Sequence, residues 1–259
     1  MTRYKNDSIR VWLRFYGPLN HLLSKERRGI TFIRNLPEST SVKDLIEGCG
    51  VPHTEVDLVL VNGRKAAFDD PVQGGERISV YPVFLSLDLP PSDRKQVRTL
   101  QSPSFVVDVN LGKLAGYLRM AGFDSLYRNN AKDKELIKTT LEEDRVLLTR
   151  DRRLLMHKVI KKGYLVRSDQ PVKQLEEVLV RFNLFGETRL FTRCIHCNGL
   201  LEEAEKADVL DQLEPLTRRY YNRFSRCKGC GQVYWAGSHR ERIDPKLQEL
   251  LAPISHQEI

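Results

Sequence analysis

Apolar side chains recur at every second position near the start of this chain, which indicates strands. Val11, Leu13 and Phe15 show this period, as expected for a strand with one buried face. The apolar runs Leu58–Val61 and Ile78–Tyr81 indicate two further strands. The first part of the chain is therefore predicted to form a small sheet.

Turn and cap residues separate these strands. Ser41 is placed to cap a short helix, and Asp44 lies favourably in the first turn of that helix. Asn62-Gly63 is a two-residue hairpin signal, and Gly74-Gly75 precedes the last strand. Strands around one helix predict an α+β domain of the β-grasp type over residues 8–85.

Residues 8–85 resemble the ubiquitin-like sulfur-carrier family by this pattern, over nearly their whole length. Sulfur carriers end in a free Gly-Gly directly after the last strand, because their terminal carboxylate becomes adenylated. In this sequence Gly74-Gly75 lies before the last strand, and the chain ends in Glu258-Ile259. The resemblance implies the ubiquitin-like fold but disfavours the carrier role, so we expect this domain to dock a protein partner.

A different pattern begins after a polar, proline-containing linker at residues 86–103. Short apolar strands now alternate with amphipathic helices, which is typical of a parallel sheet covered by helices. We predict strands at Phe105–Val107, Val146–Leu148 and Tyr164–Val166, and helices at 111–121, 133–142, 151–163 and 172–182. Residues 104–186 are therefore predicted to form an α/β domain, with Gly122 ending its first helix.

Four of the five cysteines form two pairs with two residues between the partners: Cys194 with Cys197, and Cys227 with Cys230. Asn198 and Gly231 follow the pairs and allow the chain to turn tightly behind the second sulfur. Four thiolates complete a closed tetrahedral shell, which predicts one structural Zn²⁺ in a ribbon over residues 187–243. Residues 244–259 remain a C-terminal tail, and the lone Cys49 is predicted to pack in a core.

Acidic residues lie near the ends of the predicted α/β strands. Asp108, Asp151 and Asp169 follow the three strands, and Asp133 begins an intervening helix with Glu135 two residues later. The carboxyl ends of parallel strands share one edge of a sheet, and ligands bind there. Clustered carboxylates repel one another unless cations lie between them. Oxygen ligands favour hard cations, so this pattern predicts Mg²⁺ or Mn²⁺.

Helix capping explains part of the same pattern without a metal ion. Asp133 and Asp151 both stand where N-caps stand, and capping is the alternative role for each. Asp108 is harder to explain in this way, because an aspartate that closes a buried strand is costly without a partner. Both roles stay open on the residues alone.

The chain has 42 basic and 34 acidic residues and a net charge of +8, which favours a polyanionic partner. Basic residues cluster around Asp151, and between the cysteine pairs basic residues alternate with aromatic rings. This pattern predicts contacts with RNA, and no DNA specificity is predicted. The predicted contact residues are Arg150, Arg152, Arg153, Lys158, Arg218, Arg219, Tyr221 and Arg223. A solvated charged surface is the alternative. Without a bilayer-spanning apolar run or a secretory h-region, we expect a cytoplasmic protein without a membrane partner.

Three stretches of this sequence resemble the Mut-seven C-terminal ribonuclease family. They are the run from Asp108 to Asp124, the segment Leu147–Asp151, and the cysteine pairs with the following Tyr234–His239. The resemblance covers essentially the whole chain and implies a PIN-like nuclease domain followed by a zinc ribbon, with a ubiquitin-like domain in front in some members. It also implies that Asp108 and Asp151 bind the catalytic metal ion, and that Asp133 or its rival Glu135 supplies a further acid.

We therefore predict an α/β, PIN-like parallel-sheet domain with a C-terminal zinc ribbon, preceded by an α+β ubiquitin-like domain. The predicted activity is that of a metal-dependent ribonuclease, a hydrolase that uses Mg²⁺ or Mn²⁺. Its metal ligands would be Asp108, Asp133 and Asp151, with Glu135 and Asp169 as further catalytic acids. The alternative is a non-catalytic RNA-binding adaptor that recruits partners through the ribbon and the β-grasp domain.

Overall fold

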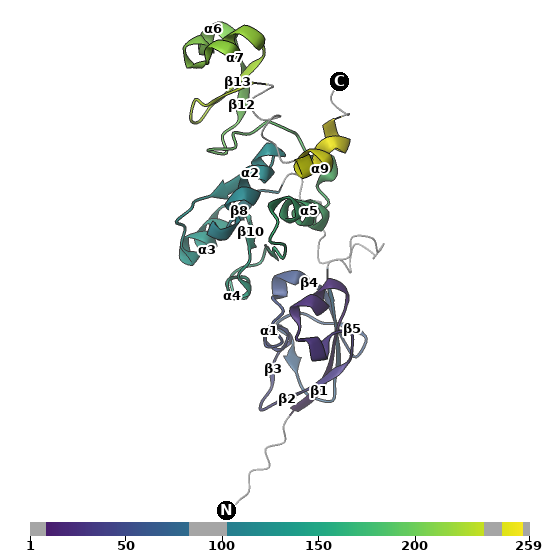
Figure 1. The fold of residues 1–259 in the computed structure, drawn as a ribbon. Coiled ribbons are helices and arrows are strands. Elements are labelled where there is room, and N and C mark those ends of the chain that lie inside the picture. The colour runs from purple at the N-terminus through teal and green to yellow at the C-terminus, as the bar shows by residue number, and fades with distance from the viewer. Residues whose placement is uncertain (1–8, 83–102, 236–244, 256–259) are drawn as a thin grey trace, which may run out of the picture. The chain divides into compact units, whose positions relative to one another are not determined.

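The computed structural model describes residues 9–82, 103–235 and 245–255 (Figure 1). The chain divides into two compact units, and each combines segments that are distant in the sequence. Among the described residues, the first unit joins 9–82 to 151–165, and the second joins 103–150 to 166–235 and 245–255. No helix within these ranges has the length and apolar character needed to cross a membrane.

The first unit is built on a five-stranded mixed sheet with the strand order β2-β1-β7-β4-β5. Its strands are β1 (Ile9–Phe15), β2 (Phe32–Leu36), β4 (Val56–Val61), β5 (Arg64–Lys65) and β7 (Arg77–Pro82). β1 and β7 run parallel, whereas the other neighbours are antiparallel. The remaining elements are the strand pair β3 (Thr40–Ser41) and β6 (Pro71–Val72), the helix α1 (Val42–Glu47), and the 3-10 turns η1 (Gly17–Leu22), η2 (Lys25–Arg27) and η3 (His53–Glu55).

Local sequence signals account for this ubiquitin-like domain. The Ser41 hydroxyl accepts a hydrogen bond from the amide of Asp44 at 3.0 Å, and so caps α1 as predicted. Asn62 and Gly63 have φ values of 51° and 80°, which the two-residue turn between β4 and β5 requires. β2 was not predicted, because its exposed Ile33 breaks the apolar alternation.

A short segment of the later sequence belongs to the first unit. Residues 151–165 contain α4 (Arg152–Leu155) and β11 (Gly163–Leu165), so the helix predicted over 151–163 is only four residues long. His53 Nε2 donates to the carbonyl of Ile160 at 2.7 Å, and the amide of Leu165 donates to Glu55 Oε1 at 2.8 Å. Side chains of η3 thus satisfy one carbonyl within the predicted helix range and one amide of β11.

The second unit contains a parallel sheet with helices. β10 (Val146–Thr149) pairs in parallel with β8 (Phe105–Val107), and β8 pairs in parallel with β9 (Ser125–Tyr127). Within the second unit, the strand order of this sheet is β10-β8-β9. Every residue of β8 and β10 is buried, as expected for parallel strands covered on both faces. The helices are α2 (Gly112–Met120), α3 (Asp133–Glu142) and α5 (Pro171–Phe182), with the 3-10 turns η4 (Val109–Leu111) and η5 (Phe185–Glu187).

Gly122 ends α2 at the predicted position and also permits a close approach of two chain segments. Its φ is 94°, a left-handed conformation that glycine adopts without strain. A Cβ at this position would lie 2.2 Å from the carbonyl oxygen of Arg189. Only glycine therefore fits where the α/β domain meets the start of the ribbon.

The ribbon is a three-stranded antiparallel sheet with the order β12-β13-β14. Its strands are β12 (Leu201–Ala204), β13 (Phe224–Cys227) and β14 (Val233–Trp235), with the short helices α6 (Lys206–Val209), η6 (Leu210–Gln212) and α7 (Pro215–Tyr220) between β12 and β13. Val209, Leu213, Phe224 and Val233 form its small core. The helix α9 (Pro245–Ser255) follows in the sequence.

Candidate functional site

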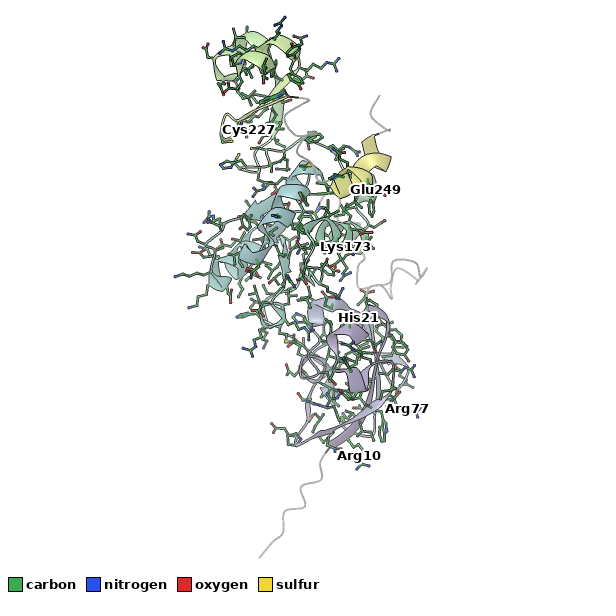
Figure 2. The ribbon with its side chains drawn as sticks, viewed as in Figure 1. Arg10, His21, Arg77, Lys173, Cys227 and Glu249 are labelled. Atoms are coloured by element: carbon green, nitrogen blue, oxygen red, sulfur yellow. The ribbon has the colours of Figure 1, made fainter. Side chains whose placement is uncertain are left out.

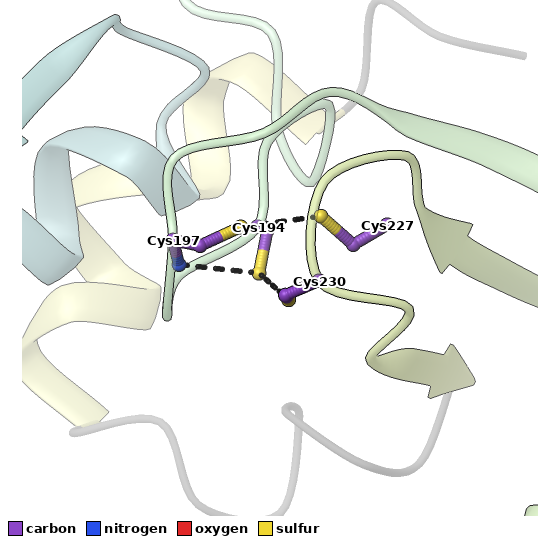
Figure 3. Close-up of side chains that lie close together, drawn as sticks. All are labelled: Cys194, Cys197, Cys227 and Cys230. Carbon is purple, nitrogen blue, oxygen red and sulfur yellow. Dashed lines mark hydrogen bonds between the residues drawn. The ribbon is translucent and has the colours of Figure 1, made fainter.

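The four predicted zinc ligands gather at one end of the ribbon. The sulfur atoms of Cys194, Cys197, Cys227 and Cys230 all lie within 4.8 Å of one another (Figure 3). Cys227 is the last residue of β13, and Figure 2 labels it within the ribbon. The Cys194–Cys230 sulfur separation is 3.6 Å, and the Cys197–Cys227 separation is 3.3 Å. Zinc bound by four sulfurs at about 2.3 Å gives sulfur separations of about 3.8 Å, so this donor set fits the ion.

The backbone around the cysteines has the tight turns that the spacing predicts. Asn198 and Gly231, the residues after the two pairs, have φ values of 71° and 75°. The amide of Gly199 donates to Cys197 Sγ at 3.4 Å, and the amide of Gly229 donates to Cys227 Sγ at 3.3 Å. A Cβ at Gly199 would lie 2.8 Å from Cys227 Sγ. These loops therefore enclose the sulfurs closely and direct amide dipoles at them, which stabilises thiolates.

A tyrosine next to the cluster favours ionisation of one thiol. The hydroxyl of Tyr234 lies 2.9 Å from Cys194 Sγ. Burial opposes ionisation of Cys194, but hydrogen bonds from Tyr234 and Cys197 outweigh it and lower its pKa to about 7. Burial raises the pKa of Tyr234, and the Cys194 sulfur raises it further, so the phenol keeps its proton as a donor. Burial also raises the pKa of Cys197, to about 12. One thiolate is thus favoured first, and a cation would stabilise the others.

Buried polar contacts attach the first cysteine loop to the α/β domain. Arg119 of α2 is buried, and its guanidinium donates to the carbonyls of Ser125, Ile195 and His196, each at 2.9 Å. The amide oxygen of Asn198 accepts from the backbone amide of Ser125 at 3.0 Å. The first cysteine pair is therefore held by the end of α2 and the start of β9.

Asp124 is the charged centre of this attachment. Its carboxylate accepts from Arg145 at 2.6 Å and from Asn198 at 2.9 Å, and it lies 3.5 Å from Arg193. Burial opposes the charge of Asp124, but the hydrogen bonds from Arg145 and Asn198 outweigh it and lower the pKa. Sequence reasoning missed Arg119 and Asp124 as structural residues. The available signal was a cation within the apolar part of a predicted helix, which requires a partner.

Asp108 lies at the carboxyl end of β8, as predicted, and is buried with 6% of its surface exposed. One carboxylate oxygen accepts from the Thr149 hydroxyl at 2.6 Å, and the other accepts from the amide of Val109 at 2.6 Å. Thr149 is the last residue of the neighbouring β10. The partner that a buried aspartate requires is thus a hydroxyl on the adjacent strand, and each carboxylate oxygen retains a lone pair.

The other four predicted acids are exposed and occupy helix starts or loops. Asp151 caps α4 by accepting from the amide of Arg153 at 2.7 Å, and Asp169 forms an ion pair with Arg150. Asp133 is the first residue of α3, where Lys132 is the N-cap. Glu135 completes the capping box of α3, accepting from the Lys132 amide at 3.3 Å.

The structure brings the cysteines together but does not gather the acids in the same way. Within the described ranges, the four cysteines are the one group of three or more His, Cys, Asp or Glu ligand atoms within mutual 4.8 Å reach. The acidic metal site at Asp108, Asp133 and Asp151 stays a prediction. His239, part of the predicted family motif, lies outside the described residues.

The predicted RNA-contact residues are exposed, apart from the half-buried Tyr221. Some of their donors have protein partners. Arg152 donates to the carbonyl of Leu22 at 3.0 Å, and Arg218 donates to the carbonyl of Leu213 at 2.7 Å. The other predicted contacts are Arg150 in its ion pair, Arg219 over the Tyr220 ring, and Arg153, Lys158 and Arg223 on the surface. Their role in RNA binding stays a prediction.

The ubiquitin-like unit, the PIN-like parallel sheet and the ribbon define a class of multidomain protein in which an α/β domain is followed by a four-cysteine ribbon. Residues 103–247 match the Mut7-C RNAse domain, and residues 8–88 match the Mut7-C ubiquitin domain. The first match spans more than half of the chain, so the chain belongs to the Mut7-C RNAse domain family. The family predicted from the sequence is confirmed.

Comparisons with individual proteins add little. A solved structure from Pyrococcus furiosus, named for molybdopterin converting factor, subunit 1, is 22% identical and has a TM-score of 0.25. The match covers 30% of this chain and 100% of that one. Comparison with curated proteins gives no match.

Proposed function

We propose that this protein is a metal-dependent ribonuclease that hydrolyses RNA phosphodiesters at the carboxyl edge of its parallel sheet. The observation that carries the proposal is Asp108, a buried carboxylate at the end of β8, held by the Thr149 hydroxyl of β10. Membership of an RNAse domain family supports the same chemistry.

The predicted acids offer the oxygen donors that a hard divalent cation requires. Asp108 supplies carboxylate oxygens with free lone pairs, and Asp151 and Asp133 are the further acids proposed as ligands, with Glu135 and Asp169 as candidate general acids or bases. Carboxylate oxygens are the ligands that Mg²⁺ and Mn²⁺ prefer. When bound, such an ion lowers the pKa of water and neutralises charge on the phosphate. The hydrogen bonds from Val109 and Thr149 orient the Asp108 carboxylate at the strand end.

Two further parts belong to the proposed function. One structural Zn²⁺ would hold Cys194, Cys197, Cys227 and Cys230 together, because a four-thiolate shell leaves no open position for catalysis. The ubiquitin-like domain would dock a protein partner, because its Gly74-Gly75 lies before β7 and cannot serve as a terminal carrier group.

The test compares RNA cleavage by the wild type, Asp108→Asn and Asp151→Asn, on single-stranded and structured RNA, with Mg²⁺, Mn²⁺ or EDTA. Asp108→Asn keeps size and hydrogen bonding but removes charge, so cleavage should fall at least about a hundredfold. RNA binding should persist, because phosphate contacts come from Lys and Arg. The matched control is Asp211→Asn, an exposed acid of the ribbon, which should cleave like the wild type.

One observation favours a second function, that of a non-catalytic RNA-binding adaptor. In the described part of the chain, the acidic side chains do not form a three-residue cluster like that of the cysteines. The adaptor hypothesis expects RNA binding without metal-dependent cleavage. Wild-type cleavage that continues in EDTA, or full activity in both Asn variants, would contradict the nuclease site.

A further inference from the structure

A cleft of about 1120 Å³ lies in the second unit, between α2 and the ribbon. One wall is a single face of α2, because Gly112, Gly116 and Met120 are spaced four residues apart and Lys113 and Tyr117 lie beside them. A second wall comes from the ribbon, and the first cysteine loop contributes Ile195 and His196 to the lining. This cleft contains none of the acids assigned to catalysis.

Aromatic rings line the cleft on both walls. Tyr117 and Tyr127 contribute from the α/β domain, and Tyr221, Tyr234 and Trp235 contribute from the ribbon. The rings of Tyr221 and Trp235 lie 6.5 Å apart with an interplanar angle of 53°. Four of these five residues are half-buried, whereas Tyr234 is buried. Rings that are held by packing and retain exposed surface are suited to stack on unpaired bases.

The charged side chains that line the cleft are all positive. Lys113 and Arg128 are exposed cations on its rim, and Asn129, Asn130 and Gln232 add neutral amides. The residues found to line the cleft include no aspartate or glutamate. Arg119 also lines it, but its guanidinium is occupied by backbone carbonyls of the cysteine loop. A lining of cations and neutral amides without acids favours binding of a polyanion whose bases also present edges for hydrogen bonding.

The cleft begins close to the predicted catalytic aspartate along the chain. Only the turn η4 separates Asp108 from Gly112, the first lining residue of α2. The Tyr127 hydroxyl donates to the carbonyl of Val109 at 3.2 Å, and a Cβ on Gly112 would lie 2.7 Å from that hydroxyl oxygen. Glycine at this position therefore lets Tyr127 lie against the start of α2, next to the turn that follows Asp108.

We propose that this cleft binds single-stranded RNA, with bases stacked on its aromatic rings and phosphates bound by Lys113 and Arg128. Unpaired bases can reach the rings, whereas bases inside an A-form duplex cannot, so the cleft selects single strands. The suggestion that the bound strand is delivered to Asp108 rests on the proposed ribonuclease function. The binding itself does not.

The experiment measures binding of a fluorescein-labelled oligouridine by anisotropy without added Mg²⁺ or Mn²⁺, so that cleavage plays no part while the zinc that holds the ribbon is retained. Tyr221→Leu keeps an apolar side chain against the ribbon core but removes the ring, and it should weaken binding about tenfold. Tyr221→Phe keeps the ring and should bind like the wild type. The matched control is Tyr220→Ala, because Tyr220 is adjacent, 66% exposed and not part of the cleft lining.

A surface lysine gives a second test that does not depend on ribbon folding. Lys113→Ala should lower the slope of log Kd against log salt by about 0.7, the value for one phosphate contact on a single strand. Lys134→Ala, at an exposed position of α3 outside the cleft, should leave the slope unchanged. An RNA duplex or an oligoglutamate that binds as tightly as the oligouridine would overturn the proposal. So would equal losses in Tyr220→Ala and Tyr221→Leu.

This result can be separated from the test of the nuclease. If the cleft variants bind normally while Asp108→Asn loses cleavage, the cleft proposal fails and the proposed function stands. If the cleft variants lose binding while no protein shows metal-dependent cleavage, the cleft proposal stands and the nuclease proposal fails.

Discussion

The cysteine cluster and the acidic positions are two cation sites predicted from the same sequence. Among the described residues, the cysteines form a compact cluster of ligand atoms and the acids do not. The cysteines come from two short loops and their sulfurs lie within 4.8 Å of one another. The acids come from separate strand ends and helix starts between Asp108 and Asp169. Asp108, Glu135 and Asp151 cap helix starts, and Asp169 forms an ion pair. A site encoded by local spacing is assembled by the backbone itself, whereas a dispersed site depends on tertiary geometry.

The partners of the acids explain why the second site is harder to predict. Asp151 and Glu135 satisfy backbone amides at the starts of α4 and α3, and Asp169 pairs with Arg150. Such roles account for an aspartate or glutamate at these positions without a cation. Asp108 differs because it is buried and bonded across strands to Thr149. A local role therefore explains Asp108 less well than it explains the other acids.

The largest expected effect is on the cysteine side of this comparison. Cys227→Ser removes one of four thiolates, and binding of structural zinc contributes about 10–16 kcal/mol to folding in small zinc domains. We expect zinc content to fall from about one ion per chain to nearly none, with loss of the ribbon's thermal transition. Elemental analysis and calorimetry measure both. Cys49→Ala is the control, because this cysteine is buried outside the cluster and should leave zinc content unchanged.

An intermediate effect is expected at Asp124, which attaches the first cysteine loop to the α/β domain. Asp124→Asn removes one of two carboxylates bonded to Arg145, the one at 2.6 Å, and leaves Glu143 at 2.7 Å. Hydrogen bonds between charged groups contribute about 1.5–3 kcal/mol, so the free energy of unfolding should fall by about 2 kcal/mol. Urea denaturation measures this loss. Zinc content should remain near that of the wild type, because no sulfur ligand is changed.

The same variant has a predicted pH signature. The pKa of Asp124 is lower in the folded protein than its ordinary value of 3.8. Its contribution to stability is therefore complete above about pH 4 and is lost as the pH falls below 3.8 through the folded-state pKa. The stability difference between wild type and Asp124→Asn should narrow in that acid range. A difference that stays constant down to pH 2 would show that the charge of Asp124 does not stabilise the fold.

The sequence was sufficient for features that depend on neighbouring residues. The cap at Ser41, the turn at Asn62-Gly63, the end of α2 at Gly122 and the cysteine turns were all predicted and are confirmed. Features that depend on distant partners were missed. The longer helix predicted after Asp151 is replaced by a short α4 and a segment that bonds to side chains of η3.

Buried polar residues account for most of what could not be predicted at the site. The guanidinium of Arg119 binds carbonyls of the cysteine loop, and this pairing joins positions far apart in the chain. Neither the helical period nor the cysteine spacing contains that information. The aromatic cleft could not be predicted for the same reason, because α2 and β14 contribute rings to it from separate parts of the sequence.

The smallest effect on stability is expected at Asp133, and it tests whether the acidic side of the comparison is a metal site. Asp133 is exposed at the first position of α3, where a negative charge near the helix start contributes about 0.3–1 kcal/mol. Asp133→Asn should therefore lower the free energy of unfolding by less than about 1 kcal/mol. Glu135→Gln should also have little effect, because glutamine can complete the same capping box.

The two variants should differ in cleavage rather than in stability. The Glu135 carboxylate is bonded to the Lys132 amide, whereas among the described residues the Asp133 side chain has no hydrogen bond or ion pair. Asp133 is thus the acid of α3 that is available to a cation. We expect Asp133→Asn to lower Mg²⁺- or Mn²⁺-dependent RNA cleavage at least about tenfold and Glu135→Gln to keep most of it. If Glu135→Gln instead loses cleavage while Asp133→Asn remains active, the two acids exchange roles. If both remain active, α3 contributes no ligand, and Asp108 and Asp151 would have to hold the ion without it.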